Sequence, residues 1–493
     1  MKDESKFSKV LSILLSVVLV ISSFYLLYQV IRLNVLPSKF LFPLTIGVVV
    51  LDAIFILLLI YFSKNVVSKI VCIVLTLFIC VASCMGGYYI SKTQGALSNI
   101  TSVAKHAKNT VSVIVKESSS IKNKSQLNGV SVGSLRLNEQ GSKKVLKELS
   151  GEGIVLNQTE YDSMTALLEA FYNGEVDSII INESSRSQIL DMETYSNFDS
   201  NTRVVYQTSY KVKNNDSATS VSDITSKPFN VLISGSDTRG GFDENGRSDV
   251  IMIATVNPKT HTILLTSVPR DFYVTTACDA GDGCMQGALD KITHTGIHGT
   301  NTTKRTVEQL LGIEINYTFK VGFDTVTELV DVLGGVDVYV EPGYATTTSE
   351  FSVHEGVNHL NAQQALAFAR ERYSYTEGDR QRTKNQQQVL MGIVKEATKP
   401  SVITNYAAIM DTMANTFSTT MSNEEITDLI KYQLNNNPTW KMEQYMVDGT
   451  GDTLMCAELG DAASVMVPDQ STVKMAKDKI NAVLAGKSSE DVK

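Results

Sequence analysis

Arginine and acidic side chains gather in three separated segments of this 493-residue chain. The segments are SGSDTRGGFDENGRSD (234–249), SVPRDF (267–272) and ARERYSYTEGDRQRTKNQ (369–386). Seven of the twelve arginines lie in them: Arg239, Arg247, Arg270, Arg370, Arg372, Arg380 and Arg382. A guanidinium group binds phosphate oxygens through two parallel hydrogen bonds and keeps its charge when it is desolvated. The pattern therefore predicts a site for pyrophosphate.

Two aspartates lie beside these arginines, where a metal ion could bind. Asp237 follows a predicted buried strand (PFNVLISGSD), Asp249 opens the next one (SDVIMIATVNP), and Arg270 ends a third (HTILLTSVPRD). Ligands of α/β sheets gather at strand ends, so these side chains could meet. Magnesium commonly takes one or two carboxylates and leaves its other positions to water and phosphate. A second interpretation is that both aspartates form turns beside neighbouring glycines.

The third segment adds cations to the same predicted site. After a predicted helix, Arg370 and Arg372 have the two-residue spacing of an extended strand, which would place both side chains on one side. Another helix is expected to follow, with Asp379 as its N-cap. In that helix Arg382 and Gln386 lie four residues apart and share one face. A single arginine could equally form a surface salt bridge, but the whole set favours an anion site.

The N-terminal part of the chain is predicted to lie in a membrane. Three apolar runs are each about long enough to cross a hydrocarbon layer as a helix: Val10 to Ile31, Leu41 to Phe62 and Ile70 to Ile90. The basic residues before the first run and in the second loop outnumber those in the first loop. This bias predicts a cytoplasmic N-terminus and an extracellular location from about residue 92 onward.

The length of the chain calls for more than one domain. Residues 1–91 are the predicted membrane anchor. Residues 100–212 alternate short apolar runs with helix-like segments, which predicts a small accessory α/β domain without a catalytic cluster. Residues 213–228 are polar and end in a proline segment, as a linker does. Residues 229–400 form the predicted catalytic core, and 401–493 its C-terminal part and tail.

Charge and cysteine content narrow the functional classes. The formal net charge of -8 argues against wholesale nucleic-acid binding. Cys278 and Cys284 could form a disulfide in an oxidising exterior, or their loop could resemble a calcium loop, although most of that pattern is missing. His294 and His298 have a spacing found in zinc sites, but no third ligand is evident, so a structural role is favoured.

Seven motifs in combination resemble the LytR-CpsA-Psr family, in particular its capsule-associated CpsA type. They are SGSDTR, GRSDVIMI, SVPRD, KITH, LGGVDVYV, ALAFARER and GDRQRTKNQ. The resemblance covers the region from about residue 229 to beyond 400. It implies a three-helix membrane anchor, then an extracellular α/β catalytic domain of the α-β-α sandwich kind with a smaller α/β accessory domain. Its members are implied to move glycans from undecaprenyl pyrophosphate carriers onto the cell wall.

The resemblance also implies roles for individual residues. Asp237 and Asp249 would hold Mg²⁺, with Mn²⁺ as an alternative. The expected pyrophosphate-binding residues are Arg247, Arg270, Lys291, Arg370, Arg372, Arg382 and Gln386. The residues expected to take part in catalysis are Arg247, Asp249, Arg270 and Asp379. A tunnel for the polyprenyl tail is implied as well, although the same apolar strands would also suit an ordinary core.

We therefore expect a membrane-anchored, Mg²⁺-dependent phosphotransferase that joins capsular polysaccharide to peptidoglycan outside a Gram-positive type of cell, working with other capsule assembly proteins. Catalysis would rest on positioning and electrostatics, because no Ser, Cys or His stands out as a nucleophile. The general base is open between Asp249 and Asp379. Two alternatives stay open: hydrolysis of the lipid pyrophosphate, and control of capsule synthesis or transcription by a membrane regulator.

Overall fold

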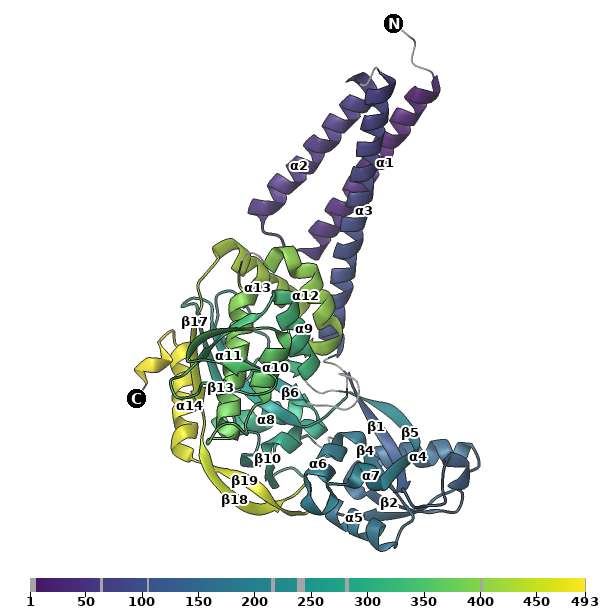
Figure 1. The fold of residues 1–493 in the computed structure, drawn as a ribbon, viewed down its shortest axis with the longest axis vertical. Coiled ribbons are helices and arrows are strands. Elements are labelled where there is room, and N and C mark those ends of the chain that lie inside the picture. Colours follow the sequence, from purple (N-terminus) through teal and green to yellow (C-terminus); the bar gives the residue numbers. More distant parts are fainter. Residues whose placement is uncertain are drawn as a thin grey trace. The chain divides into compact units, whose positions relative to one another are not determined.

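The computed structural model describes residues 6–62, 65–103, 106–213, 218–236, 244–279, 283–399 and 402–492. The chain divides into two compact units, whose elements are labelled in Figure 1. The first unit comprises Met1–Asn99, Thr398–Ala414 and Ser422–Pro438. The second comprises Ile100–Ala397, Asn415–Met421 and Thr439–Lys493.

Three long apolar helices form most of the first unit. They are α1 (Lys6–Leu33), α2 (Ser38–Leu57, continued by the π-helical turn Leu58–Phe62) and α3 (Val66–Val103). Each is long and apolar enough to cross a membrane, which confirms the predicted count of three. Two later helices, α12 (Val402–Thr416) and α13 (Asn423–Asn436), contribute to the same unit. Lys92 near the end of α3 forms a 2.9 Å ion pair with Asp411 of α12.

A five-stranded mixed sheet lies at the centre of residues 106–213. Its order is β3 (Asn157–Tyr161), β2 (Ser131–Leu135), β4 (Ser178–Asn182), β1 (His106–Lys116) and β5 (Thr202–Lys213). Both faces are covered, because alternate residues of β4 enter different cores: Ile179 and Ile181 join one, and Ile180 joins the other. The covering helices are α4 (Glu139–Gly151), α5 (Met164–Asn173), α6 (Arg186–Asp191) and α7 (Phe198–Asn201). The accessory region is therefore an α/β fold.

A six-stranded mixed sheet organises the rest of the second unit. Its order is β16 (Phe417–Thr419), β11 (Tyr317–Gly322), β6 (Phe229–Ser236), β7 (Ser248–Asn257), β8 (Thr262–Ser267) and β17 (Lys441–Met446). The three consecutive strands β6, β7 and β8 pair antiparallel, while β11 and β17 pair parallel with β6 and β8. These three strands are the ones predicted from the sequence.

Helices lie on both faces of this sheet. On one face Leu232, Ile253 and Leu264 pack with residues of α8 (Thr300–Leu311) and α14 (Gln470–Leu484). The other face turns toward α9 (Phe323–Leu333), α10 (Ala362–Arg370) and α11 (Asp379–Ala397), with Ile233 and Met252 among its residues. Neighbouring residues of a strand point to opposite faces, so β6 and β7 can be apolar on both. The predicted α-β-α arrangement is confirmed.

Short hairpins and a 3-10 segment complete the second unit. The remaining strands are β9 (Tyr273–Thr275), β10 (Leu289–Lys291), β12 (Val336–Val340), β13 (Thr346–Thr347), β14 (Ser352–Val353), β15 (Gly356–Leu360), β18 (Gly449–Cys456) and β19 (Asp461–Pro468). The 3-10 segment η6 (Ile292–His298) runs from β10 toward α8. These pieces carry residues to the strand ends, where the candidate site lies.

Candidate active site

A cluster of ion pairs lies where the start of β7, the loop after β8 and the start of α11 meet. Arg270 is at its centre. Its Nη1 donates to Oδ1 of Asp249 at 2.9 Å, and its Nε lies 3.7 Å from Oδ2 of Asp271 and 4.0 Å from Oδ1 of Asp379. Asp379 also forms an ion pair with Arg382, one helical turn further along α11. The fold thus joins three segments that are far apart in the sequence.

Two further cations border the cluster. Nη2 of Arg247 lies 3.8 Å from Oδ2 of Asp249, and the same guanidinium forms an ion pair with Asp191, the last residue of α6 in the accessory region. Nζ of Lys291, at the end of β10, lies 3.1 Å from Oδ1 of Asp271. Both cations had been expected at the site, and both lie beside it.

Sequence reasoning missed three of the contacting residues. Asp271 bridges Arg270 and Lys291, and Thr293 of η6 donates to Asp249 at 3.4 Å. Asp271 directly follows Arg270 in SVPRDF, and Thr293 lies within KITH, so both could have been found from those motifs. Asp191 belongs to a region without any motif, and the sequence carries no signal for its contact with Arg247.

The electrostatics show a crowded, partly desolvated site. Burial opposes the charge of Arg270, but the carboxylates of Asp249, Asp271 and Asp379 outweigh it and raise the arginine's pKa. Burial and the neighbouring positive charge of Arg270 instead lower the pKa of Arg382. For Asp271, burial favours the neutral acid, yet Lys291 and Arg270 hold its pKa below the usual range. The cluster therefore keeps its carboxylates ionised while its cations repel each other.

Three of the arginines have unused hydrogen-bonding capacity. The Nε atoms of Arg247, Arg270 and Arg382 are buried and have no hydrogen-bond partner within the described part of the chain. A buried donor without a partner costs about 1–3 kcal/mol, and more when it is charged. Such groups are rare in folded proteins and call for a specific explanation. An anion with several acceptor oxygens would supply the partners for all three.

The predicted strand at Arg370 and Arg372 is wrong. Arg370 is the last residue of α10, and Glu371 then takes an extended conformation, so the chain leaves a helix at this point. Arg372 donates to the hydroxyl of Tyr373 at 2.6 Å and lies 4.7 Å from the centre of its ring. Its charge still contributes to the lowered pKa of Arg382. Asp379 is the first residue of α11, and its carboxylate contacts Arg382.

An apolar pocket of about 80 Å³ extends from this cluster between the sheet and its helices. Its walls include Ile233 and Met252 from the sheet and Leu366 and Val389 from the helices. Gln386, one turn after Arg382 in α11, also lines it. The pocket therefore joins an apolar interior to the polar face that Arg382 and Gln386 were expected to share.

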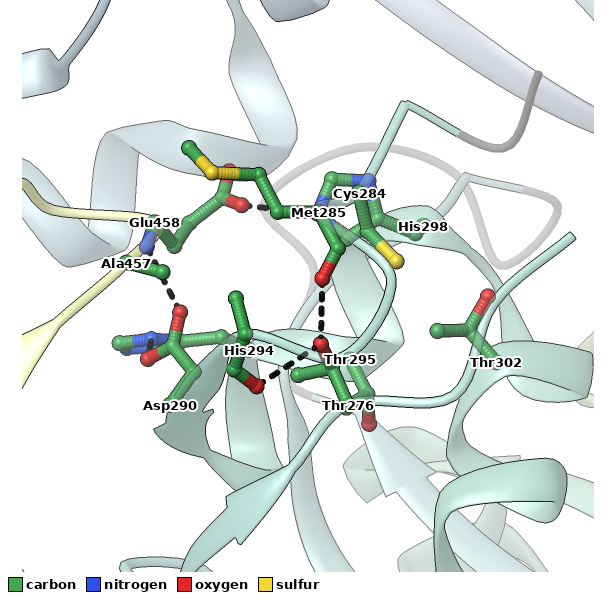
Figure 2. A pocket seen from close by; sticks show the side chains of 11 residues that line it. Thr276, Cys284, Met285, Asp290, His294, Thr295, His298, Thr302, Ala457 and Glu458 are labelled. Carbon is green, nitrogen blue, oxygen red and sulfur yellow. Dashed lines mark hydrogen bonds and ion pairs between the residues drawn. The ribbon is translucent and has the colours of Figure 1, made fainter. Parts of the chain in front are cut away.

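Asp237 and Arg239 lie outside the described residues, so the expected metal pair is represented by Asp249 alone. No group of three or more His, Cys, Asp and Glu side chains suited to a metal ion occurs in the described ranges. Figure 2 shows the surroundings of His294 and His298. His294 pairs with Asp290 at 2.7 Å, and His298 pairs with Glu458 at 2.9 Å. Each histidine thus has its own carboxylate partner, as a structural role requires.

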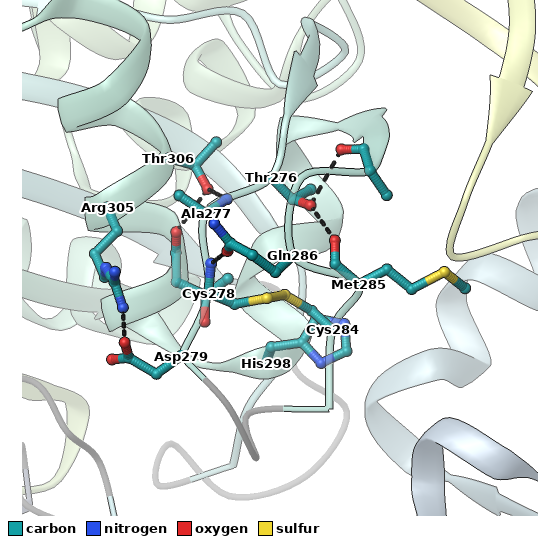
Figure 3. Close-up of a disulfide and its surroundings, with 12 residues drawn as sticks. Thr276, Ala277, Cys278, Asp279, Cys284, Met285, Gln286, His298, Arg305 and Thr306 are labelled. Carbon is teal, nitrogen blue, oxygen red and sulfur yellow. Dashed lines mark hydrogen bonds and ion pairs between the residues drawn. A yellow bond between two sulfur atoms is a disulfide. The ribbon is translucent and has the colours of Figure 1, made fainter.

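The two cysteines outside the predicted spans that lie close in sequence form a disulfide. Cys278 and Cys284 are bonded, as Figure 3 shows, which settles the alternative left open by the sequence in favour of the crosslink. Asp279 of this loop forms an ion pair with Arg305 of α8. The crosslink and the ion pair tie the loop to the helix that follows η6.

These features define an α-β-α domain with a cationic cluster at the strand ends, in a chain that also carries three candidate membrane spans. The family model described as LytR_cpsA_psr matches residues 194–482. The chain belongs to the LytR_cpsA_psr family, which confirms the resemblance seen in its motifs. The match begins within the accessory region and runs through α14 to Ala482.

Known relatives carry a related fold and a common name. One is the polyisoprenyl-teichoic acid--peptidoglycan teichoic acid transferase TagU of Bacillus cereus, 33% identical over 207 residues, or 42% of this chain and 65% of that protein. TagU of Bacillus subtilis is 34% identical over 203 residues, or 41% of this chain and 63% of that protein. The chain thus spans slightly less than two thirds of these relatives. A crystal structure of B. subtilis TagU is 28% identical and covers 52% of this chain and 97% of that one, with a TM-score of 0.40.

Proposed function

We propose that this protein transfers a glycopolymer from a polyprenyl pyrophosphate carrier to peptidoglycan. In its finer form the proposal names capsular polysaccharide as the glycopolymer, undecaprenyl as the lipid and Mg²⁺ as the cofactor. The observation that carries it is the set of three buried guanidinium Nε atoms without partners, on Arg247, Arg270 and Arg382. The TagU relatives, whose names describe transfer of a teichoic acid to peptidoglycan, support the reaction class.

The reaction needs positioning and charge stabilisation more than covalent chemistry by the protein. An acceptor hydroxyl of peptidoglycan attacks the sugar-bearing phosphorus and forms a new O–P bond. The bond from that phosphorus to the bridging oxygen breaks, and polyprenyl phosphate leaves with the bonding electrons. Asp249 or Asp379, the two cluster carboxylates closest to the arginine groups, would take the hydroxyl proton. Arg270 and Arg382 would stabilise the charge that gathers on the leaving phosphate.

Asp249 also suits a hard divalent cation. Its Oδ1 accepts from Arg270 at 2.9 Å, whereas the only ion pair of its Oδ2 with a described residue is the long one to Arg247 at 3.8 Å. A carboxylate oxygen with free lone pairs beside a phosphate site is a common magnesium ligand. Asp249 would therefore hold the metal together with Asp237. When bound, the metal would lower the cost of the charge on the pyrophosphate.

The apolar pocket next to Gln386 supports a lipid-linked substrate. Its lining of aliphatic side chains would hold the first part of a polyprenyl chain, while the pyrophosphate lies at its polar end. A soluble sugar nucleotide would leave this pocket empty. The candidate membrane helices would keep the protein at the surface where such a carrier resides, with the catalytic domain on the outer side.

The test uses the full-length protein in detergent micelles with lipid-linked capsular oligosaccharide, uncrosslinked peptidoglycan and Mg²⁺, and products are read by mass spectrometry. We expect glycan joined to peptidoglycan through phosphate, and we expect Asp249→Asn to abolish it. Asp452→Asn, at an exposed position in β18, is the matched control. Release of free glycan phosphate without transfer would replace the proposal with hydrolysis. Absence of any reaction in the presence of both substrates would remove the enzymatic proposal.

A further inference from the structure

A second, larger cavity lies apart from the ion-pair cluster. It measures about 380 Å³ and lies between the five-stranded sheet of the accessory region and the catalytic domain, inside the second compact unit. One wall comes from β1, β4, β5 and the start of α4. The other comes from residues 245, 283–284, 297–298, 301 and 458. This volume is sufficient for a ligand the size of a few sugar rings.

Amide side chains dominate the polar lining of this cavity. Asn109, Asn138 and Asn182 contribute from the accessory wall, and Asn245 and Asn301 from the catalytic wall. Each amide offers a carbonyl acceptor and an NH₂ donor. Neighbouring hydroxyl groups of a sugar need the same combination, because each hydroxyl both donates and accepts. Opposed amide walls therefore suit a polyhydroxylated ligand.

Several of these amides lack partners for buried atoms. Asn138 is only 8% exposed, and its Nδ2 has no hydrogen-bond partner within the described ranges. The same holds for Oδ1 of Asn109 and Oδ1 of Asn182. Buried polar atoms are nearly always hydrogen-bonded, so three such atoms along one cavity wall indicate a site built to receive polar groups.

The charged side chains of the cavity are already paired with one another. His298 on the catalytic wall pairs with Glu458 at 2.9 Å, as Figure 2 shows. Arg136 on the accessory wall pairs with Asp162 at 2.6 Å. The lining also includes the apolar side chains of Leu137 and Ile297, which can pack against the C–H faces of sugar rings. The chemistry of the cavity fits an uncharged polar ligand better than an anion.

Two chain segments connect this cavity with the ion-pair cluster. Asn245 lines the cavity, and Arg247 two residues later pairs with Asp249 in the cluster. The 3-10 segment η6 likewise contributes Ile297 to the cavity and Thr293 to the cluster, where it donates to Asp249. Beside them the disulfide of Figure 3 fixes Cys284 in the cavity wall. A chain bound in the cavity would thus have one end close to the reacting phosphate.

We propose that this amide-lined cavity is a glycan-binding site, which holds an uncharged stretch of glycan during transfer. Its part in the reaction rests on the function proposed above, but binding itself requires no turnover. The glycan comes from one of two sources with the same chemistry, the peptidoglycan strand that accepts or the polymer that is donated. The accessory region therefore has a direct role in substrate binding, which its lack of catalytic motifs does not reveal.

Binding is measured by isothermal titration calorimetry on the full-length protein in detergent micelles. The probes are chitotetraose, an uncharged N-acetylated oligosaccharide that resembles the peptidoglycan backbone, and capsular oligosaccharide released from its carrier. Asn182→Leu and Asn301→Leu alter opposite walls. Asn173→Leu, at the exposed end of α5 and outside the cavity, is the matched control. We expect saturable binding that each wall variant weakens at least about tenfold, because two or more hydrogen bonds are lost, while the control leaves it unchanged.

The outcomes separate this proposal from the function proposed above. Arg270→Ala should keep glycan binding even where it loses turnover, since its side chain does not line the cavity. Preference for chitotetraose assigns the site to the acceptor strand, and preference for the capsular oligosaccharide assigns it to the donor. If Asn182→Leu fails to fold, Asn301→Leu on the other wall decides. Absence of saturable binding at millimolar concentrations of both probes, or binding unchanged in the folded wall variants, would overturn the proposal.

Discussion

Arg186 in the accessory region and Arg270 in the catalytic domain are both shielded from solvent and both surrounded by carboxylates, yet their hydrogen bonds differ. The Nε and Nη2 of Arg186 donate to the two oxygens of Glu183 at 2.6 and 2.8 Å, and its Nη1 donates to Asp199 at 2.9 Å. Arg270 makes a single printed hydrogen bond, to Asp249, and its Nε has no partner in the described structure.

This difference separates a structural arginine from one prepared for a ligand. Burial lowers the pKa of Arg186, but Glu183 and Asp199 more than compensate, and the bidentate geometry uses its donors within the domain. The guanidinium also lies 5.4 Å from the ring of Phe198, which is part of the accessory core. Arg270, Arg247 and Arg382 instead keep donors in reserve. The four predictions below test whether hydrogen-bond saturation divides the ionic groups of this protein by role.

Arg270→Ala should have the largest effect. We expect turnover of the lipid-linked donor to fall by about 10²–10³-fold, the usual loss when one preorganised donor to a developing charge is removed. The fold should persist, because each carboxylate around Arg270 keeps another cation: Asp249 has Arg247, Asp271 has Lys291 and Asp379 has Arg382. Steady-state kinetics and thermal unfolding check both parts.

Arg305→Ala is the control for this experiment, since Arg305 forms its ion pair with Asp279 on α8 and lies outside the cluster. Near-normal turnover in Arg270→Ala, or an equal loss in Arg305→Ala, would contradict a ligand-binding role for the unsatisfied arginine.

Arg186→Met should show the opposite pattern. Glu183 has no second cation among its described ion pairs, so the substitution leaves a poorly solvated carboxylate next to the accessory core. Breaking a buried pair in this way typically costs about 3–5 kcal/mol of stability. We expect a large decrease in the denaturant midpoint and an unchanged turnover per folded molecule at low temperature. A folded variant of wild-type stability would show that saturated hydrogen bonds do not identify structural arginines here.

Much of this division was visible in the sequence. The three apolar runs, the three central strands and the gathering of Arg247, Asp249 and Arg270 at strand ends all follow from periodicity and from where ligands bind in α/β sheets. The conformation at Arg370 was misread because two arginines separated by one residue look the same on a strand and at a helix end. Only the extended Glu371 after α10 distinguishes the two cases.

Contacts across the two folded regions could not be predicted. The pairing of Asp191 with Arg247 joins positions 56 residues apart in different sheets, and neither segment carries a periodic signal for the other. The amide-lined cavity likewise depends on asparagines of both regions, and a lone asparagine in a sequence reads most simply as a turn residue. Physical proximity alone gives these residues a shared role.

Asp191→Asn should sharpen the comparison with a smaller effect. Asp191 supplies Arg247 with a carboxylate partner, so it competes with an anionic ligand for the same guanidinium. The Asp191 side chain is well exposed, and exposed ion pairs contribute about 0.2–1 kcal/mol. We expect the KM for the lipid-linked donor to fall by about two- to fivefold, with kcat almost unchanged. Asp162→Asn, which removes the partner of Arg136, is the control. An increase in KM would mean that Asp191 positions Arg247 for the substrate.

Glu443 extends the same rule from arginines to carboxylates, with the smallest expected effect. It lies in β17 and is saturated: it accepts from the backbone N–H of Ser489 at 2.8 Å and from the hydroxyl of Ser488 at 2.8 Å, and it pairs with Lys441 at 2.9 Å. Burial favours its neutral form, but these hydrogen bonds and the Lys441 charge lower its pKa to about 2 from an ordinary value of 4.5.

A carboxylate whose pKa is lower in the folded than in the unfolded state stabilises the fold fully above the unfolded value, and this stability is lost as pH falls toward the folded value. We therefore expect the thermal midpoint of the wild type to decline between about pH 4.5 and pH 2. The decline should be shallower in Glu443→Gln, which is uncharged throughout, while turnover at neutral pH stays unchanged in the folded variant. Parallel profiles for the two proteins would show that the hydrogen bonds of Glu443, although complete, do not couple its ionisation to folding.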